Sequence, residues 1–323
     1  MTSRPAQPAP EQAAEQPHGQ PQLSPWPSAA EERARSPASP EAGEAAGESP
    51  QLASASHRLA YADLDFLRRP ELRPVRLQLE LLKAELVQQE QGIESTVVIF
   101  GSTRIPEPEL ARARLRAAED AAAAAPDDAD LARRAAVARS ILAKAKYYDE
   151  AQRLAAIITE VSQQNAHRHY VVVTGGGPGI MEAANRGAFN AGGRSLGLSI
   201  VLPREERPNR YVTPELSFQF HYFAVRKMHF VLRARALVVF PGGYGTLDEL
   251  FETLTLIQTR KVHRVPVLLF GRDYWERVVD FDALVEEGTI DPPDRELIQF
   301  VETADAAWAL IREFWRDADI GSA

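Results

Sequence analysis

Two glycine-rich turns, each placed directly after a short apolar run, constrain the fold of this chain more than any other feature. The first is Thr174-Gly-Gly-Gly-Pro-Gly-Ile-Met-Glu182, and the second is Pro241-Gly-Gly-Tyr-Gly-Thr-Leu-Asp-Glu249. If the apolar runs are parallel strands, both turns lie at the carboxyl edge of one sheet. A glycine-rich turn that leads into a helix presents backbone N–H groups to a phosphate. Two such turns on one sheet favour a phosphate site over glycines that serve only tight packing.

Five apolar runs, two of which precede the glycine turns, predict the strands of the sheet. They are Thr96–Phe100, Tyr170–Thr174, Ser195–Leu202, Leu237–Phe240 and Val265–Phe270, and enough chain for a helix separates each from the next. Strands that alternate with helices form parallel sheets covered on both faces. The sequence therefore predicts an α/β fold with a Rossmann-like, doubly wound parallel sheet, preceded by an N-terminal helical extension.

The domain boundaries follow from shifts in composition. Ten of the 23 prolines fall within the first 50 residues, which have few large apolar side chains, so residues 1–57 are predicted to be a disordered tail. Residues 58–94 are predicted to be a helical extension that packs on the domain through the three- and four-residue spacing of Val75, Leu79, Leu82 and Leu86.

The catalytic domain is predicted to span residues 95–323, with a helical insertion at about 107–148. Alanine, arginine, leucine and glutamate dominate from Glu107 to Gln164, and the pattern breaks once at Pro126. We expect two helices here, joined by a turn that Asp127 or Asp128 caps.

Composition excludes several classes of function. The chain of 323 residues has no cysteine, which excludes disulfides, thiolate nucleophiles and cysteine-bound zinc and makes a reducing cytoplasm the default location. Its net charge of −8 disfavours nucleic acid as a partner. No apolar run approaches the roughly 18 residues of a membrane span, and the N-terminus lacks the apolar segment of a signal peptide.

The choice of phosphate ligand depends on which motifs are absent. Neither turn carries the Lys-Ser/Thr pair of a Walker loop, and the strand that ends near Pro203 lacks the acid that NAD binding requires. Arg204 and Arg207 keep NADP open as an alternative. A mononucleotide fits two phosphate-binding turns best. The histidines at 167, 169, 229 and 263 show no ligand spacing with carboxylates, so no metal is predicted.

Arg226 and Glu249 are expected at the same edge of the sheet. Arg226 lies in the first turn of a helix that precedes the strand Leu237–Phe240, and Glu249 lies in the first turn after the second glycine turn, where the helix dipole and arginine would keep its carboxylate ionised. Taken singly, each residue is also explained as a surface ion pair or a helix-end acid. Together they suit N-glycosidic cleavage, because a fixed carboxylate stabilises an oxocarbenium-like ribose.

These residues carry a resemblance to a known family. The two turns and the Arg226-Lys227 pair resemble the LOG family, often labelled lysine decarboxylase, over roughly Val97 to Phe314. Its members are phosphoribohydrolases that split a nucleoside 5′-monophosphate into free base and ribose 5-phosphate. The resemblance implies that Arg226 and Glu249 are catalytic and that the glycines and Thr246 of the second turn hold the 5′-phosphate.

The predicted substrate-binding set combines these motifs with polar residues after the first strand. It comprises Ser102, Arg104, Gly175, Gly176, Gly177, Gly179, Met181, Glu182, Lys227, Gly242, Gly243, Tyr244, Gly245 and Thr246.

The resemblance also bears on substrate and assembly. The chain is more similar to the long bacterial branch of the family. It has a long N-terminal region and an insertion, and it has Phe230 where short plant-like members usually have Met. An AMP-like nucleotide is therefore expected rather than a cytokinin nucleotide. No cofactor is expected, because pyridoxal phosphate needs a Schiff-base lysine and only Lys227 of the five lysines is near the site. Family members are homodimers or larger, and Phe251, Leu254 and Ile257 are expected to face a partner. The alternative is a non-catalytic nucleotide or molybdenum-cofactor carrier of the same fold.

Overall fold

The computed structural model describes residues 49–202 and 207–320. Contacts divide the chain into two compact units, the first ending at Leu72 and the second beginning at Arg73. The described part of the first unit contains the short elements η2 (Ala55–His57), α2 (Leu64–Leu67) and η3 (Pro70–Leu72). Most of the predicted disordered tail, residues 1–48, lies outside the described residues.

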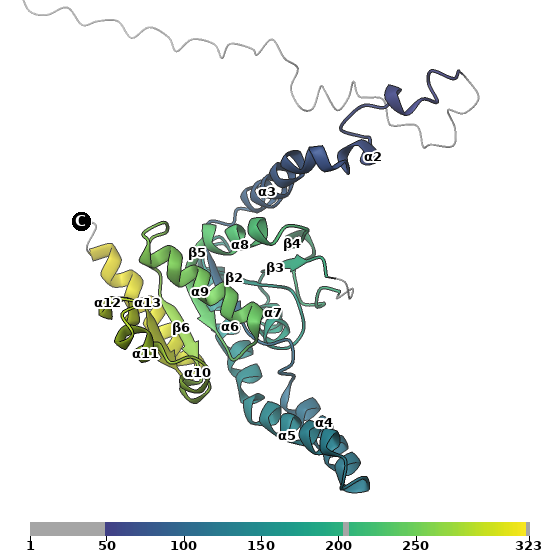
Figure 1. Ribbon diagram of the computed structural model, residues 1–323. Coiled ribbons are helices and arrows are strands. Elements are labelled where there is room, and N and C mark those ends of the chain that lie inside the picture. Colours follow the sequence, from purple (N-terminus) through teal and green to yellow (C-terminus); the bar gives the residue numbers. More distant parts are fainter. Residues whose placement is uncertain (1–48, 203–206, 321–323) are drawn as a thin grey trace, which may run out of the picture. The chain divides into compact units, whose positions relative to one another are not determined.

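The second unit is built on one parallel sheet of seven strands, which confirms the predicted fold class (Figure 1). The strands are β1 (Thr96–Phe100), β2 (Val171–Thr174), β3 (Ser195–Ile200), β4 (Ser217–Phe220), β5 (Ala234–Val239), β6 (Val267–Phe270) and β7 (Ile298–Val301). Their order is β4-β3-β2-β1-β5-β6-β7, so the chain builds outward from β1 on one side and then resumes at β5 on the other. The topological switch point, where open sheets bind ligands, therefore lies between β1 and β5.

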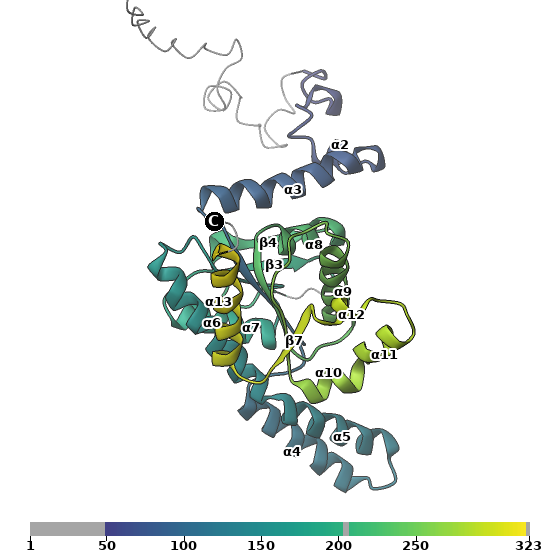
Figure 2. The same ribbon diagram turned by 90° about the vertical axis from the view of Figure 1, so that its left-hand side faces the viewer.

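Helices cover both faces of the sheet (Figure 2). They are α3 (Arg73–Glu90), α4 (Pro108–Ala124), α5 (Ala129–Lys144), α6 (Lys146–Gln164), α7 (Ile180–Asn190), α8 (Phe223–Leu232), α9 (Tyr244–Gln258), α10 (Arg272–Val278), α11 (Phe281–Glu286), α12 (Pro292–Arg295) and α13 (Ala304–Ile320), with the 3₁₀ turn η4 (Pro214–Leu216) before β4.

Successive residues of β1 point to opposite cores, as strand geometry requires. Val97 and Ile99 join the core beneath α6, α7 and α13. Val98 and Phe100 join the core beneath α3, α8, α9 and α10. All five β1 residues are buried, which explains why this strand is an uninterrupted apolar run.

Two strands were not predicted from the sequence. β4 pairs with β3 at one edge, and only alternate residues, Phe218 and Phe220, are buried. β7 pairs with β6 at the other edge. Phe218 and Phe220 therefore belong to a strand and not to the helix that carries Arg226. In the structure, α8 ends at Leu232, and Ala234 already belongs to β5.

The stretch from Glu107 to Gln164 forms three helices, α4, α5 and α6, where the sequence predicts two. Asp128 does cap α5, because its carboxylate accepts hydrogen bonds from the N–H groups of Asp130 and Leu131. The helices α4 and α5 pack chiefly on each other and extend away from the sheet (Figures 1 and 2), whereas α6 belongs to the core.

The predicted packing face of α3 is wrong. Val75, Leu79, Leu82 and Leu86 are 39–51% exposed, and the core contacts come instead from Leu77, Leu81, Ala84 and Val87. Both sets have helical spacing, so periodicity could not choose between them.

None of the helices in the described segments is long and apolar enough to cross a membrane.

Candidate active site

The candidate site lies where β1, β2 and β5 end, at the switch point of the sheet. The loop after β1 is tied to the loop after β5, since the Ser102 N–H donates to the Pro241 carbonyl at 3.0 Å and the Phe240 N–H to the Phe100 carbonyl at 2.8 Å. The Ile180 N–H, at the start of α7, donates to the Ser102 carbonyl at 3.2 Å. The three loops that carry the predicted site residues therefore form one edge.

The second glycine turn forms the N-terminus of α9. Gly243 is the N-cap and supplies no side chain to the first-turn N–H groups, while its carbonyl accepts from Thr246 and Leu247. Gly242 packs so tightly on Thr246 that a Cβ there would lie 2.1 Å from Oγ1. A long helix that begins in this way directs free N–H groups and the positive end of its dipole outward. This geometry suits a phosphate. The Tyr244 side chain is 92% exposed.

The first glycine turn is more constrained than the sequence suggested. Gly176 and Gly179 have positive φ values of 75° and 71°, and a Cβ at Gly179 would lie 2.4 Å from the Ser102 carbonyl oxygen. The Gly176 N–H donates to Thr174 Oγ1 at 2.9 Å, and the Ile180 N–H is used by Ser102. These two N–H groups are therefore not available to a ligand, which corrects the expectation of an open row of donors.

Arg226 and Glu249 meet beside these turns. Arg226 Nη1 lies 3.5 Å from Glu249 Oε1, and the two side chains are only 13% and 8% exposed. Arg226 Nε donates to the Leu198 carbonyl at 2.7 Å, and the guanidinium lies over the Phe230 ring at 4.9 Å. Its Nη2 is 2.8 Å from where a Gly175 Cβ would stand, so a larger residue at this position would require the end of the arginine side chain to move.

Burial changes the charge state expected for this pair. It raises the pKa of Glu249 to about 7, although the nearby charges of Arg226 and Lys227 act in the opposite direction. Burial likewise lowers the pKa of Arg226, against the opposing effect of Glu249. The sequence-based expectation of a fully ionised Glu249 is therefore wrong. Near neutral pH this carboxyl exchanges readily between its acid and base forms, as a proton-transferring group must.

Lys227 points toward α9. Its Nζ lies 2.8 Å from Asp248 Oδ1 and 2.9 Å from Glu252 Oε2. Lys227 thus forms ion pairs with one α9 residue before Glu249 and one after it. Direct contact of Lys227 with substrate stays a prediction. An ammonium held by two carboxylates also fits poorly with a Schiff base, which requires an unprotonated amine.

The remaining predicted residues occupy different parts of the edge. Ser102 Oγ accepts from the Arg104 N–H at 3.1 Å, and the Arg104 side chain is exposed. Met181 fills the space beside the first turn, because a Cβ at Gly175 or Gly177 would lie 2.8 Å from its thioether end. Glu182 lines a hollow of about 410 Å³ on the far side of that turn.

Sequence reasoning missed the residues that hold the two turns. Asn209 hydrogen-bonds the first turn, and the Tyr274 hydroxyl donates to the carbonyl of Gly242 in the second. Asn185 lies fully buried and hydrogen-bonds Thr174 and Ser195. Neither Asn209 nor Tyr274 belongs to a motif, and both act over more than 30 positions in sequence, so no local signal could identify them.

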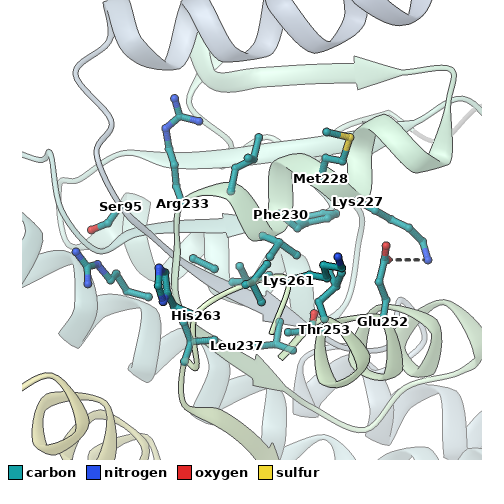
Figure 3. A pocket seen from close by; sticks show the side chains of 18 of the residues that line it. Ser95, Lys227, Met228, Phe230, Arg233, Leu237, Glu252, Thr253, Lys261 and His263 are labelled. Atoms are coloured by element: carbon teal, nitrogen blue, oxygen red, sulfur yellow. Dashed lines mark ion pairs between the residues drawn. The ribbon is translucent and has the colours of Figure 1, made fainter. Parts of the chain in front are cut away.

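A cavity of about 600 Å³ lies between α8 and α9, away from the glycine turns (Figure 3). Phe230 and Leu237 form part of its apolar wall, and the Lys227–Glu252 ion pair lies at one side. Neither Arg226 nor Glu249 lines it. This cavity therefore does not mark the candidate site. In the described part of the chain, no group of three or more His, Asp or Glu residues could hold a metal ion.

The fold and the site define a Rossmann-like α/β protein with a buried arginine–glutamate pair between two glycine turns. A family model described as "Possible lysine decarboxylase" matches residues 181–311. "Cytokinin riboside 5'-monophosphate phosphoribohydrolase LOG7" of Arabidopsis thaliana is 32% identical over 154 residues, which cover 46% of this chain and 69% of that protein. LOG3 of the same plant is 30% identical and is covered to 77%, with 53% of this chain aligned. The chain belongs to this LOG family.

The likeness to relatives does not extend over their whole length. The match with "Probable cytokinin riboside 5'-monophosphate phosphoribohydrolase LOGL5" of Oryza sativa subsp. japonica, at 33% identity, spans 48% of this chain and 63% of the rice protein. Among solved structures, the molybdenum cofactor carrier protein from Chlamydomonas reinhardtii aligns with a TM-score of 0.40 and 17% identity, over 69% of this chain and 99% of that chain.

Proposed function

We propose that this protein hydrolyses the N-glycosidic bond of a nucleoside 5′-monophosphate such as AMP, giving the free base and ribose 5-phosphate. The observation that carries the proposal is the buried contact between Arg226 and Glu249 at the carboxyl edge, next to both glycine turns. Membership of the LOG family supports the same reaction class.

The proposed binding mode follows the charges at this edge. The 5′-phosphate binds the N–H groups at the start of α9 around Gly243 and Gly245, together with the Thr246 hydroxyl, where the helix dipole favours an anion; the Thr246 N–H itself donates to the Gly243 carbonyl. The ribose then lies near Glu249, and the base extends toward the first glycine turn and Met181. Arg226 is held by Leu198 through Nε and by Glu249 through Nη1, which directs Nη2 toward the Gly175 side of the site.

The chemistry needs one water molecule and no redox step. As the bond between C1′ and the base nitrogen breaks, its electron pair leaves with the base and positive charge develops on the ribose. The Glu249 carboxylate stabilises this charge and accepts a proton from the attacking water, whose oxygen bonds to C1′. The departing nitrogen takes up a proton from solvent and Glu249 releases the proton that it accepted, so the products are neutral base and ribose 5-phosphate and the carboxylate is restored.

The substrate panel that tests the proposal is AMP, GMP, CMP, UMP, adenosine and ADP, with ribose 5-phosphate measured as product. We expect cleavage of monophosphates and at least about a thousandfold lower kcat/KM for adenosine, equivalent to about 4 kcal/mol of lost phosphate contacts. Binding of AMP without cleavage would instead support the carrier alternative.

The catalytic assignment is tested by Glu249→Gln, which keeps the shape of the side chain and removes its charge. We expect kcat for AMP to fall by about a thousandfold or more, because the developing cation loses its counter-charge, while AMP still binds in calorimetry. The exposed Glu215→Gln serves as the control for a neutral change elsewhere. Activity of Glu249→Gln within a few-fold of the wild type would contradict the assignment.

A further inference from the structure

The first glycine turn is held from behind by one side chain that no sequence motif marks. Asn209 lies in the segment between β3 and β4. Its backbone N–H donates to the Gly176 carbonyl at 2.8 Å, and its Nδ2 donates to the same carbonyl at 3.1 Å and to the Gly177 carbonyl at 3.0 Å. Two successive peptide carbonyls of the turn are thus bound by a single residue.

A buried network fixes Asn209 in turn. Its Nδ2 is also 2.9 Å from Asn185 Oδ1, so its two N–H groups are shared among three acceptors, and its Oδ1 accepts from the Tyr211 N–H at 3.2 Å. Asn185 Oδ1 accepts from Thr174 Oγ1 at 2.7 Å, and its Nδ2 donates to Ser195 Oγ at 3.0 Å. Asn185 and Thr174 are fully buried, so no water can replace their partners, whereas Asn209 is half-buried.

Three successive carbonyls of the turn have partners that come from β3 or from the segment after it. Ser199 Oγ donates to the Gly175 carbonyl at 3.4 Å, and Asn209 binds the next two. A trans peptide is planar, with its C=O and N–H directed oppositely. Because the Gly176 carbonyl faces Asn209, the N–H of Gly177 in the same peptide faces away from Asn209.

Glycine peptides need such a constraint, because glycine adopts left- and right-handed conformations with similar ease. Gly176 has φ +75°, and rotation of the Gly176–Gly177 peptide would exchange its N–H for its carbonyl oxygen. A carbonyl oxygen directed at the substrate side would replace a hydrogen-bond donor by an acceptor where the base is proposed to bind, and it would stand beside the Gly175 edge that Arg226 approaches.

We propose that Asn209 is a positioning residue that locks the Gly176–Gly177 peptide with its carbonyl toward β3 and its N–H toward the substrate. The inference rests on the proposed function for its substrate. Asn209 itself does not touch the reacting atoms and acts through the first glycine turn.

The test uses Asn209→Asp, which keeps the Oδ1 acceptor for Tyr211 but replaces the donor by an oxygen that faces two carbonyls. Asn209→Ala, which removes donor and charge together, is the second variant, and the exposed Glu215→Ala is the control. All are made in the full chain and also combined with Glu249→Gln, so that AMP affinity is measured without turnover. Hydrogen exchange of residues 174–180 is followed in the ligand-free proteins.

We expect Asn209→Asp to weaken AMP binding by about tenfold or more. The new carboxylate oxygen cannot donate to the two carbonyls, so the turn loses both hydrogen bonds. Exchange within residues 174–180 should accelerate by a similar factor. Asn209→Ala should show the same changes with smaller size, and Glu215→Ala should show neither. If the wild type neither cleaves nor binds AMP, the proposed function fails, while hydrogen exchange still decides whether Asn209 holds the turn.

AMP affinity of Asn209→Asp within twofold of its parent would overturn the inference, whatever its melting temperature. The same holds if exchange in residues 174–180 is unchanged. A merely structural role would lower the melting temperature of both Asn209 variants and leave the affinity of the folded protein intact.

Discussion

At the scale of single residues, the charge of Glu249 is set by competition between burial and neighbouring cations. Burial raises its pKa to about 7, against Arg226 and Lys227. The general-base role proposed above requires the ionised carboxylate. In mildly acidic solution most molecules carry the protonated acid, so only a fraction of them can act. This places the working range of the site on the alkaline side of neutrality.

We therefore expect kcat/KM for AMP to rise with pH and to level off above about 7, falling about tenfold per unit well below that value. The second ionisation of the substrate phosphate, near 6, would add curvature at lower pH. A profile that is flat between pH 5.5 and 8 would contradict the role of Glu249.

The titration of Glu249 can also be measured in the ligand-free protein, where ionisation of the substrate phosphate plays no part. The folded pKa of Glu249, about 7, is above its ordinary value of 4.5, so the folded state binds an extra proton between these values. The stability contributed by this proton is complete below 4.5 and is lost as pH rises through about 7, by on the order of 3 kcal/mol. Urea unfolding of the wild type against Glu249→Gln should show this difference, and a difference that does not vary with pH would contradict it.

At the scale of elements, the N-terminus of α9 depends on one glycine more than on its neighbour. A Cβ at Gly242 would lie 2.1 Å from Thr246 Oγ1 and 2.6 Å from its Cβ, whereas a Cβ at Gly243 meets nothing within 4 Å. The two glycines of the same motif therefore serve different purposes.

Gly242→Ala should destabilise the protein by about 1–3 kcal/mol, as overpacking does, and should weaken AMP binding because Thr246 must move. Gly243→Ala should unfold at the wild-type urea concentration, and its effect on AMP affinity then measures how closely the phosphate approaches that backbone. Equal stability of the two variants would show that the α9 turn yields easily.

The helix α3 provides a second test at this scale, because two neighbouring leucines face opposite environments. Leu81 packs on the core beneath α8, while Leu82 is 49% exposed. Leu81→Ala should cost about 1–2 kcal/mol in urea unfolding, and Leu82→Ala should stay within about 0.5 kcal/mol of the wild type. A larger loss for Leu82→Ala would show that this exposed stripe is covered in solution.

At the scale of the whole molecule, the structure revises which residues can meet a second copy. Of the three predicted, Ile257 is only 7% exposed and Leu254 packs partly into the protein's own core, whereas Phe251 is 36% exposed. Met228 and Leu232 on α8 are 48% and 55% exposed. We therefore expect the predicted homodimer to use the exposed apolar residues of α8 together with Phe251.

Light scattering at micromolar concentration should give the mass of a dimer or larger assembly. The double variant Met228→Glu with Leu232→Glu should shift the protein toward monomer, because two buried carboxylates at an interface are strongly unfavourable. Leu79→Glu on the exposed stripe of α3 is the matched control for an apolar-to-acid change. A monomeric wild type would exclude the dimer, and an unchanged mass of the double variant would exclude this interface.

The sequence by itself determined the parallel sheet, the two glycine turns and the common edge of Arg226 and Glu249. Continuous apolar runs indicate strands buried on both faces, and in a parallel sheet every strand end lies on the same side. These inferences need only local pattern and connectivity.

Only the tertiary structure decided which face of α3 is buried, how Glu249 titrates and what holds the first turn. Leu81 and Leu82 are equally apolar, and their burial depends on where α8 lies. The pKa of Glu249 depends on how much water the fold excludes, and the edge strands β4 and β7 are short runs whose pairing comes from neighbours far along the chain. Asn209 reaches carbonyls 32 and 33 positions away. Such interactions exist only after the chain has folded, because their energy comes from groups that local sequence does not bring together.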